Sequence, residues 1–503
     1  MSRTKRSAFA FFSGLGSSVV TLLIGLMSTP VLLRFLGDER AGTFRIATEW
    51  LGYLALMDFG LGGVLQATVA RRLGHNETSK ALADVRRAMR LFARVALLQL
   101  AALFFFGLTA RWLISGLSTE ALFELRMGLL VSAIGTVWVP LAALRPLLDG
   151  AQRSYWVNAA LLVQSLGTVG LSILFAWWGW GLTGQFTAAL LGSAAYTFFL
   201  FRLVSRVFPD VWRPLSDVQP DKFPPGWPMF MFNLVGRFSI MSDGIILGAI
   251  QGPGEVVRFY VTQRLMLVVV SQVQGIGNAT WAALADLHHR GESDIFRHRF
   301  LQLNRWTAIL AVAGLGPLAV LNERLISLWV GISRYGGDAL TWATFGQALL
   351  VAQVALWAWP LVGGGMVKLV LPVMFVGSIL NLILSIVGTY ILGLVGPSLG
   401  TFAGYLLVYY WWYPRLLQKE FGLSRISIMS PLLLATALFT PIGCGLWSVS
   451  QYFPNGFMGN RIMDFFAWGM MAGTGGVIYL CLAWKILIPL KERQRWPKRL
   501  SRR

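Results

Sequence analysis

A repeat of 215 residues constrains this chain more than any other feature of its sequence. Seven glycine, alanine and phenylalanine positions of the first half recur in the second half at this offset: Gly37, Phe44, Gly60, Gly62, Ala67, Ala70 and Gly181 correspond to Gly252, Phe259, Gly275, Gly277, Ala282, Ala285 and Gly396. Both copies consist of apolar runs that are long enough to cross a membrane as helices. Two homologous membrane lobes are the usual construction of a carrier that opens alternately to either side. The repeat therefore predicts a transporter.

The composition fits a membrane protein. Hydrophobic residues make up 56% of the 503 residues and charged residues only 13%, so an ordinary water-soluble surface cannot be assembled. The apolar runs predict an all-α polytopic protein with about fourteen transmembrane helices. Each lobe takes six of them, and an even number returns the chain to its starting side. We therefore expect the lobes to be related by a pseudo-twofold axis along the membrane normal, with two C-terminal helices that have no partner in the first lobe.

The predicted domains follow from this count. Residues 1–205 form an N-terminal six-helix lobe, and residues 226–420 form a C-terminal six-helix lobe. Residues 206–225 between them are rich in proline, which blocks helix continuation, so they are expected to be a cytoplasmic linker. Residues 421–503 supply the extra helix pair and a basic cytoplasmic tail.

The distribution of positive charge predicts the orientation. With the N-terminus inside, about 32 of the 43 Lys and Arg residues are cytoplasmic and about 9 are outside. Both termini are then cytoplasmic. The net charge of +21 is what this orientation and the anionic inner leaflet require, so it does not indicate a nucleic-acid partner.

Charged side chains inside the apolar runs are the first candidates for a functional site. Each costs about 2.5 to 3.5 kcal/mol at a helix centre on insertion scales, and such residues commonly have a function. Arg237 and Asp243 lie in the seventh run, Arg264 lies in the eighth, and Glu49 and Asp58 lie in the second. Adding 215 to Glu49 gives Arg264, so the repeat predicts an acid and a base at matching positions, where they could meet across a cavity between the lobes.

Three short segments near the N-terminus resemble a known family. They are Thr-Pro-Val-Leu-Leu-Arg-Phe-Leu-Gly at 29–37, Ala-Gly-Thr-Phe at 41–44 and Leu-Gly-Tyr-Leu-Ala-Leu-Met-Asp-Phe-Gly-Leu-Gly at 51–62. This pattern resembles the bacterial polysaccharide transporters, which are the O-antigen flippases of the multidrug, oligosaccharidyl-lipid and polysaccharide exporter superfamily. It covers the first two spans closely, and the two six-helix lobes extend the likeness over most of the chain.

The resemblance implies transport without covalent chemistry. The expected substrate is an undecaprenyl-diphosphate-linked oligosaccharide, moved from the inner to the outer leaflet of the bacterial inner membrane during surface polysaccharide biosynthesis. Such a protein is no enzyme and needs no cofactor or metal, and its partners could include a polysaccharide polymerase or other assembly proteins besides membrane lipids. The extra helix pair is similar to that of the lipid II flippases of the same superfamily, where additional helices make a groove for the lipid tail.

A sugar-diphosphate headgroup requires fixed positive charge in a wet cavity. Arg237 and Arg264 are therefore the leading substrate-binding candidates. Arg45 and Glu49 are spaced i and i+4 on one helix face, so they could form an ion pair that releases its arginine to the diphosphate, or a static pair that only neutralises buried charge. Arg34 is a further substrate-binding candidate, although an arginine at a helix end commonly snorkels to the interface.

The acidic residues are candidates for coupling or gating. Asp58 precedes Gly60 and Gly62, so its carboxylate could instead satisfy backbone groups at a helix break. Asp243 shares its predicted span with Arg237, and Glu49 corresponds to Arg264 in the repeat. All four histidines lie in predicted cytoplasmic loops, and no constellation typical of a metal site or a nucleophile is present in the sequence.

The sequence leaves two other functions open. A multidrug cation extruder of the same superfamily would need cavity acids without competing arginines, so Arg237 and Arg264 argue against it. An integral-membrane polysaccharide polymerase or ligase would need catalytic groups on a large outer loop. The predicted outer loops are at most about 20 residues long, as set by the span assignments, which disfavours that class.

Overall fold

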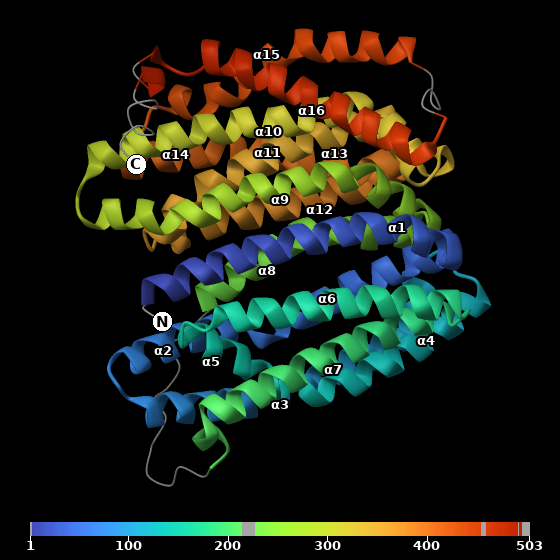
Figure 1. Cartoon of the computed structure of the whole chain (residues 1–503), viewed down its shortest axis with the longest axis vertical. Coiled ribbons are helices and arrows are strands. Elements are labelled where there is room, and N and C mark those ends of the chain that lie inside the picture. The colour runs from blue at the N-terminus through green and yellow to red at the C-terminus, as the bar shows by residue number, and fades with distance from the viewer. Residues whose placement is uncertain (1–2, 214–226, 454–458, 491, 495–503) are drawn as a thin grey trace. The chain divides into compact units, whose positions relative to one another are not determined.

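Helices form every regular element in the part of the chain that the structure describes. The structure is a computed structural model, and it describes residues 3–213, 227–453, 459–490 and 492–494. The first half contains α1 (Arg3–Ala55), α2 (Leu61–Gly74), α3 (Thr78–Leu113), α4 (Thr119–Ile134), α5 (Leu144–Gly150), α6 (Ser154–Trp177) and α7 (Gly181–Val207). The second half contains α8 (Trp227–Ile250), α9 (Pro253–His289), α10 (Ser293–Trp329), α11 (Asp338–Gly363), α12 (Val367–Leu392), α13 (Gly396–Gly404), α14 (Tyr410–Phe421), α15 (Arg425–Tyr452) and α16 (Arg461–Ile486) (Figure 1).

The contacts divide the chain into two compact units. Unit 1 comprises Met1–Arg237 and Leu247–Val256, and unit 2 comprises Phe238–Ile246 and Val257–Arg503. Helix α8 therefore contributes to both units, whereas the sequence predicts that it belongs wholly to the second lobe. The domain boundaries given above stay a prediction, and most of the proline-rich linker and the end of the basic tail lie outside the described residues.

Close packing explains why the end of α8 belongs to unit 1. The backbone N–H of Ser115, after α3, donates to the carbonyl of Gly248 over 3.0 Å. A side chain at Gly248 would overlap the side chain of Ile46, so glycine lets this end of α8 pack closely against α1.

The described residues contain eleven helical segments that are long and apolar enough to span a membrane, or twelve if the bent α8 is one span. The sequence predicts about fourteen spans. Length and hydropathy do not divide the chain into that many helices, because two of the segments are much longer than a single span. Residues 20–58 run through a break at Gly37, whose φ is +74°. The segment Val367–Phe421 has 55 residues, or roughly 80 Å of helix, against a hydrocarbon core of about 30 Å. The count of fourteen stays a prediction.

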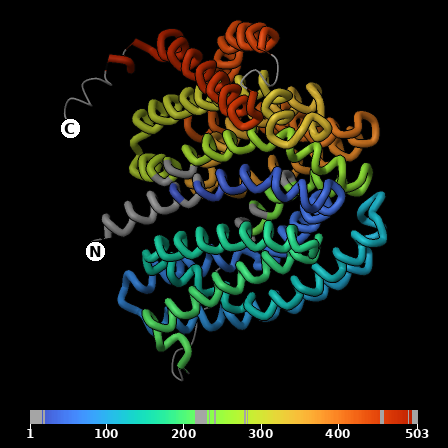
Figure 2. The backbone as a smooth tube through the Cα atoms, turned by 45° about the vertical axis from the view of Figure 1, so that its right-hand side comes forward, coloured from blue at the N-terminus to red at the C-terminus, as the bar shows by residue number. Residues whose placement is uncertain are grey.

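In unit 1, α6 packs along both α1 and α7, as the two views agree (Figures 1 and 2). One end of the unit is filled by an apolar cluster from α2, α3, α5 and α7, whose fully buried members include Leu65, Val85, Leu144 and Val204. These leucines and valines recur at helical spacing in their segments, which is why the helices bury one face here.

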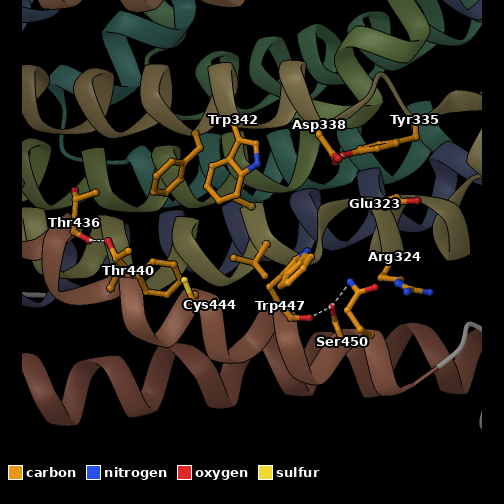
Figure 3. A pocket seen from close by; sticks show the side chains of 16 residues that line it. Glu323, Arg324, Tyr335, Asp338, Trp342, Thr436, Thr440, Cys444, Trp447 and Ser450 are labelled. Carbon is orange, nitrogen blue, oxygen red and sulfur yellow. Dashed lines mark hydrogen bonds between the residues drawn. The ribbon is translucent and has the colours of Figure 1, made fainter.

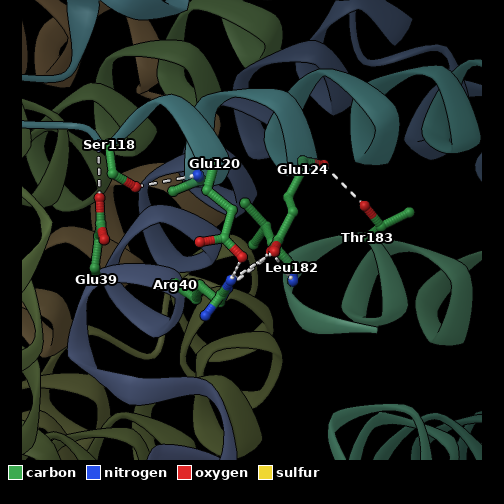
Figure 4. Close-up of polar contacts among 8 residues, drawn as sticks. Glu39, Arg40, Ser118, Glu120, Glu124, Leu182 and Thr183 are labelled. Carbon is green, nitrogen blue, oxygen red and sulfur yellow. Dashed lines mark hydrogen bonds and ion pairs between the residues drawn. The ribbon is translucent and has the colours of Figure 1, made fainter. Parts of the chain in front are cut away.

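An ion-pair network joins three helices at the other end of unit 1 (Figure 4). Arg40 of α1 donates to Glu120 and Glu124 of α4, with Nη2 to oxygen distances of 2.5 and 2.7 Å. Glu124 also accepts the backbone N–H of Leu182 at the start of α7 over 2.7 Å, so its negative charge lies at a helix N-terminus. Gly181 has φ +53°, and a Cβ there would overlap the Glu124 carboxylate, so glycine is required.

Helix α10 lies at the core of unit 2. It packs against α11, α15 and α16, and 67% of its most apolar window is buried, compared with 22 to 28% for the windows of α15 and α16. The extra helices α15 and α16 therefore pack on the rest of unit 2.

Helices α12 and α13 approach each other closely through glycines spaced four residues apart. Gly396, Gly400 and Gly404 lie on one face of α13, opposite Gly388, Ser385 and Asn381 of α12. Small residues at this spacing let two helix backbones approach in a membrane. Asn381 then hydrogen-bonds Ser385 and Thr401 at 2.9 and 3.1 Å, so the interface is both close-packed and polar.

The repeat is also visible in the contacts inside each unit. Two contacts of the first copy recur in the second copy, 215 to 218 residues later. Leu54 contacts Gln99 in the first copy, and Val269 contacts Gly314 in the second. Likewise, Gly128 contacts Phe186, and Gly346 contacts Phe402. Each pair joins the same two helices of its copy. The sequence repeat therefore corresponds to a repeated packing scheme.

Asn304 of α10 ties α15 to unit 2. Its Nδ2 donates to the carbonyl of Ile428 over 2.9 Å, and its Oδ1 accepts from Gln353 and Trp357 of α11 over 2.5 and 2.6 Å. Replacing Asn304 with leucine should destabilise the protein by about 3 kcal/mol, because the Trp357 N–H and the Ile428 carbonyl lose their partner and Gln353 keeps only its bond to the backbone carbonyl of residue 304. The midpoint of thermal unfolding in detergent measures this, with His298→Leu, at an exposed position of the same helix, as control. Equal midpoints for both variants would contradict the assignment.

Candidate functional site

The second apolar run is broken where it reaches Asp58. A 3-10 turn at Leu56–Asp58 ends α1, and the next residues, Phe59 and Gly60, have φ values of +52° and +75°. The Asp58 carboxylate accepts the N–H of Gly60 over 2.9 Å. Asp58 thus satisfies a backbone donor at a helix break, which is the structural alternative that the sequence left open.

A side chain from α3 compensates the same break. The Nε2 of Gln99 donates to the carbonyl of Leu54 over 2.9 Å. In an uninterrupted helix this carbonyl would accept an intrahelical bond, and in lipid an unpaired carbonyl is costly. Gln99 therefore gives the carbonyl of Leu54 a hydrogen-bond partner at the point where the helix is interrupted.

Replacing Gln99 with leucine should destabilise the chain by about 1 to 3 kcal/mol, because the Leu54 carbonyl would lose its partner in an apolar setting. The measurement is thermal unfolding of purified protein in detergent. Gln272→Leu, at an exposed position of α9, is the matched control. If both variants unfold at the same temperature, Gln99 does not support the break.

A cavity of about 440 Å³ lies beside the break, entirely within unit 1. Its polar lining consists of Asp58, Gln66, Gln99, Arg145 and Asp149. Arg145 and Asp149 are i and i+4 on α5, with 3.6 Å between Nε and Oδ2. The sequence analysis missed all of these except Asp58. The signal that could have revealed Arg145 and Asp149 was a pair of opposite charges at helical spacing beside an apolar run.

Glu49 and Arg45 form the ion pair that their spacing predicts. The distance from Arg45 Nη2 to Glu49 Oε1 is 3.2 Å, and Glu49 is 2% exposed whereas the Arg45 side chain is 46% exposed. The acid is therefore buried, while its arginine still has an accessible face. Arg34, the other candidate on α1, is exposed.

The remaining candidates are divided between the units. Arg237 is exposed and belongs to unit 1, whereas Asp243 (5% exposed) and the half-buried Arg264 belong to unit 2. Glu49 and Arg264 thus lie in different units. Their predicted meeting across a cavity stays a prediction, as do the roles of all seven candidate residues.

Polar side chains pack around Gln263, the residue before Arg264 in α9 of unit 2. Its neighbour in sequence, Gln263, donates to the Ser398 hydroxyl over 2.6 Å, and Ser398 lies 3.4 Å from the Thr344 hydroxyl. These residues come from α9, α13 and α11, and all three are buried. Buried hydrogen bonds of this kind hold membrane helices together. Within the described residues, no group of three or more His, Cys, Asp or Glu side chains could hold a metal ion.

Residues 10–282 match the family described as polysaccharide biosynthesis protein, which is more than half of the chain. The chain belongs to this family. The resemblance of its first two spans to the polysaccharide transporters is thereby confirmed. No curated protein matches the sequence.

Solved structures with the same fold are transporters. The chain is similar to the lipid II flippase MurJ in its inward closed conformation, with a TM-score of 0.72 and 12% identity over 95% of this chain and 99% of that one. It is also similar to an inward-facing multidrug resistance MATE transporter of the MOP superfamily, with a TM-score of 0.66 and 15% identity over 83% and 95% of the two chains. A MOP superfamily transporter from Pyrococcus furiosus, described as having a binding pocket of reverse polarity, gives 0.55 and 14% over 86% and 94%. This member of the polysaccharide biosynthesis family is therefore a multi-pass membrane protein with the MurJ and MATE fold.

Proposed function

We propose that the chain is a flippase for an undecaprenyl-diphosphate-linked oligosaccharide, working by alternating access in the inner membrane of a bacterium. The observation that carries the proposal is the family match on a chain whose fold is that of a lipid flippase over nearly its whole length. The transported unit would serve O-antigen, capsule or exopolysaccharide biosynthesis. The reaction makes and breaks no covalent bond, so the protein is not an enzyme in this proposal.

The intramembrane arginines support a diphosphate headgroup. Guanidinium groups stay charged and present planar forked donors that match phosphate oxygens. Arg237 and Arg264 are the proposed ligands, and Arg45 can turn from Glu49 toward substrate because half of its side chain is exposed. Arg34 would receive the headgroup near the outer surface. Asp58, Asp243 and Glu49 are the proposed coupling and gating acids.

The proposed orientation follows the positive charge of the loops and places both termini in the cytoplasm. An unneutralised charge of −2 that moves outward from a negative interior would gain about 4.6 kcal/mol at 100 mV, from about 2.3 kcal/mol per charge. The membrane potential therefore contributes to the driving force.

A second candidate function is multidrug cation extrusion, because MATE transporters share the fold. A cationic substrate would meet Arg237 and Arg264 with repulsion, whereas an anionic headgroup would be attracted. Charge therefore favours the flippase.

The test is transport by the purified chain in liposomes. Lipid-linked oligosaccharide is supplied in one leaflet, and a membrane-impermeant sugar oxidant measures its appearance in the other. A cationic dye trapped in parallel vesicles tests the second function. We expect rapid movement of the lipid and retention of the dye. Dye efflux without lipid movement would overturn the proposal.

A further inference from the structure

Unit 2 contains a second cavity, of about 660 Å³, that the transport site does not use (Figure 3). It lies between α10, the start of α11 and the extra helix α15, so the extra helix supplies one of its walls. This volume falls within the range of about 300 to 1,000 Å³ that is typical of small-molecule sites.

The cavity is long and its lining changes character along its length. On α15 it extends from Thr436 to Gln451, which at a rise of 1.5 Å per residue is roughly 22 Å. That length matches one leaflet of a hydrocarbon core about 30 Å thick together with part of its interface. Aromatic side chains are prominent in its lining, among them Phe345, Phe439 and Trp447. An acyl chain fits such a wall.

The charged groups collect at one end. Glu323, Arg324 and Asp338 lie together there, opposite Thr436 and Thr440 (Figure 3). Asp338 accepts a hydrogen bond of 2.6 Å from the Tyr335 hydroxyl. Burial, and then the carboxylates of Asp338 and Glu323, raise the pKa of Tyr335 well above its usual range, so it stays a neutral donor. On the proposed orientation, this end faces the outer surface.

The charged side chains that line the mouth of the cavity are two carboxylates and one guanidinium. The nearby Arg334 and Arg461 donate instead to backbone carbonyls at the C-terminal end of α10, namely those of Val330, Leu328 and Ser327, and they do not line the cavity. In this lining, the two anionic phosphates of a diphosphate would meet two carboxylates and only one guanidinium. A headgroup that carries both an ammonium and a phosphate can satisfy all three charges.

We propose that this cavity binds an outer-leaflet phospholipid with a phosphoethanolamine headgroup. The ammonium donates to Glu323 and Asp338, the phosphate accepts from Arg324, and one acyl chain lies between α10, α11 and α15. The extra helix pair therefore builds a site for a zwitterionic membrane lipid, apart from the lipid-linked substrate.

Native mass spectrometry of the full chain in detergent tests the headgroup. The probes are dioleoyl phosphatidylethanolamine, dioleoyl phosphatidylglycerol and undecaprenyl diphosphate. We expect one phosphatidylethanolamine to bind most tightly, and each of Glu323→Gln and Asp338→Asn to weaken it by roughly tenfold, since each removes a charge-assisted hydrogen bond. Glu120→Gln, a carboxylate of unit 1, is the matched control and should bind as the wild type does. Equal or tighter binding of either anionic lipid would overturn the proposal.

The two cysteines can report where the lipid binds, without a mutation in the cavity. Cys444 lines the cavity and is exposed, whereas Cys481 on α16 is exposed but lies outside it. In a Cys481→Ser background, phosphatidylethanolamine should slow alkylation of Cys444 severalfold, and phosphatidylglycerol should not. If bound phosphatidylethanolamine leaves the alkylation rate of Cys444 unchanged, the lipid lies elsewhere and the site is refuted.

Discussion

Replacing Arg264 with alanine should reduce flipping of lipid-linked oligosaccharide by roughly a hundredfold. A bidentate pair of charge-assisted hydrogen bonds to a diphosphate contributes about 3 kcal/mol in total, and alanine removes both. The Arg237→Ala variant should behave similarly if both arginines hold the headgroup. The liposome assay described above measures the rate, after the variants have been matched for reconstituted protein.

Two further variants distinguish binding from structural roles. Arg264→Lys keeps the charge but not the forked geometry, so it should retain part of the activity. Arg290→Ala is the matched control, because Arg290 directly follows the last residue of the same helix, in an exposed pair with Asp286. It should transport at the wild-type rate. Wild-type transport by both Arg237→Ala and Arg264→Ala would place the headgroup elsewhere and leave these arginines as structural partners.

Replacing Gly400 with leucine should destabilise unit 2 by about 3 kcal/mol or more, which is at the upper end of overpacking effects. A Cβ at this position would overlap backbone atoms of Ser385, which cannot rotate away as a side chain can. The α12 and α13 pair would have to separate, with loss of the hydrogen bond that Thr401 donates to Asn381. The yield of monodisperse protein and its thermal unfolding midpoint in detergent measure the effect.

The control for this prediction is Gly445→Leu on α15. Gly445 is also a glycine inside a membrane helix, but a Cβ there meets no atom within 4 Å. Its replacement removes a flexible residue without a collision and should leave the midpoint unchanged or raised. Equal losses for the two variants would show that glycine content, and not close approach, determines the stability.

The repeat in the sequence predicted the packing well where both copies carry the same residue. Gly37 and Gly252 both have positive φ, and Gly181 and Gly396 both begin a helix. A glycine permits the same backbone geometry in either copy, so the 215-residue offset predicts the local structure at these positions.

The repeat was misleading where a partner side chain differs. Gly60 lies at a helix break, but its counterpart Gly275 lies inside the continuous helix α9. The residue that corresponds to Asp58 is Val273, which cannot accept a hydrogen bond, and the one that corresponds to Gln99 is Gly314. Without these two polar side chains the second copy has nothing to satisfy the backbone groups of a break. A glycine permits a break, and its neighbours in space decide whether it forms.

The candidate site was predicted less completely than the fold. Charges inside an apolar run can be found in sequence, which is how Glu49, Asp58 and Arg264 were chosen. Gln66 and Gln99 are neutral and ordinary in sequence, and only the arrangement of α2 and α3 brings them to one cavity. The division of Arg237 and Asp243 between two units also depends on packing along α8, which no residue pattern revealed.

The network of Arg40, Glu120 and Glu124 has a mechanical consequence for unit 1. It fixes α1, α4 and α7 to one another at one end, while the broken backbone at Asp58 and the empty volume beside it lie 18 residues further along the chain, roughly 27 Å away by helical rise. Thermal motion in the unit should therefore increase with distance from Arg40. Amides near Glu124 would exchange with solvent deuterium slowly and those of the broken backbone at residues 56–60 more rapidly, so that the broken segment can move while the other end of the unit stays fixed.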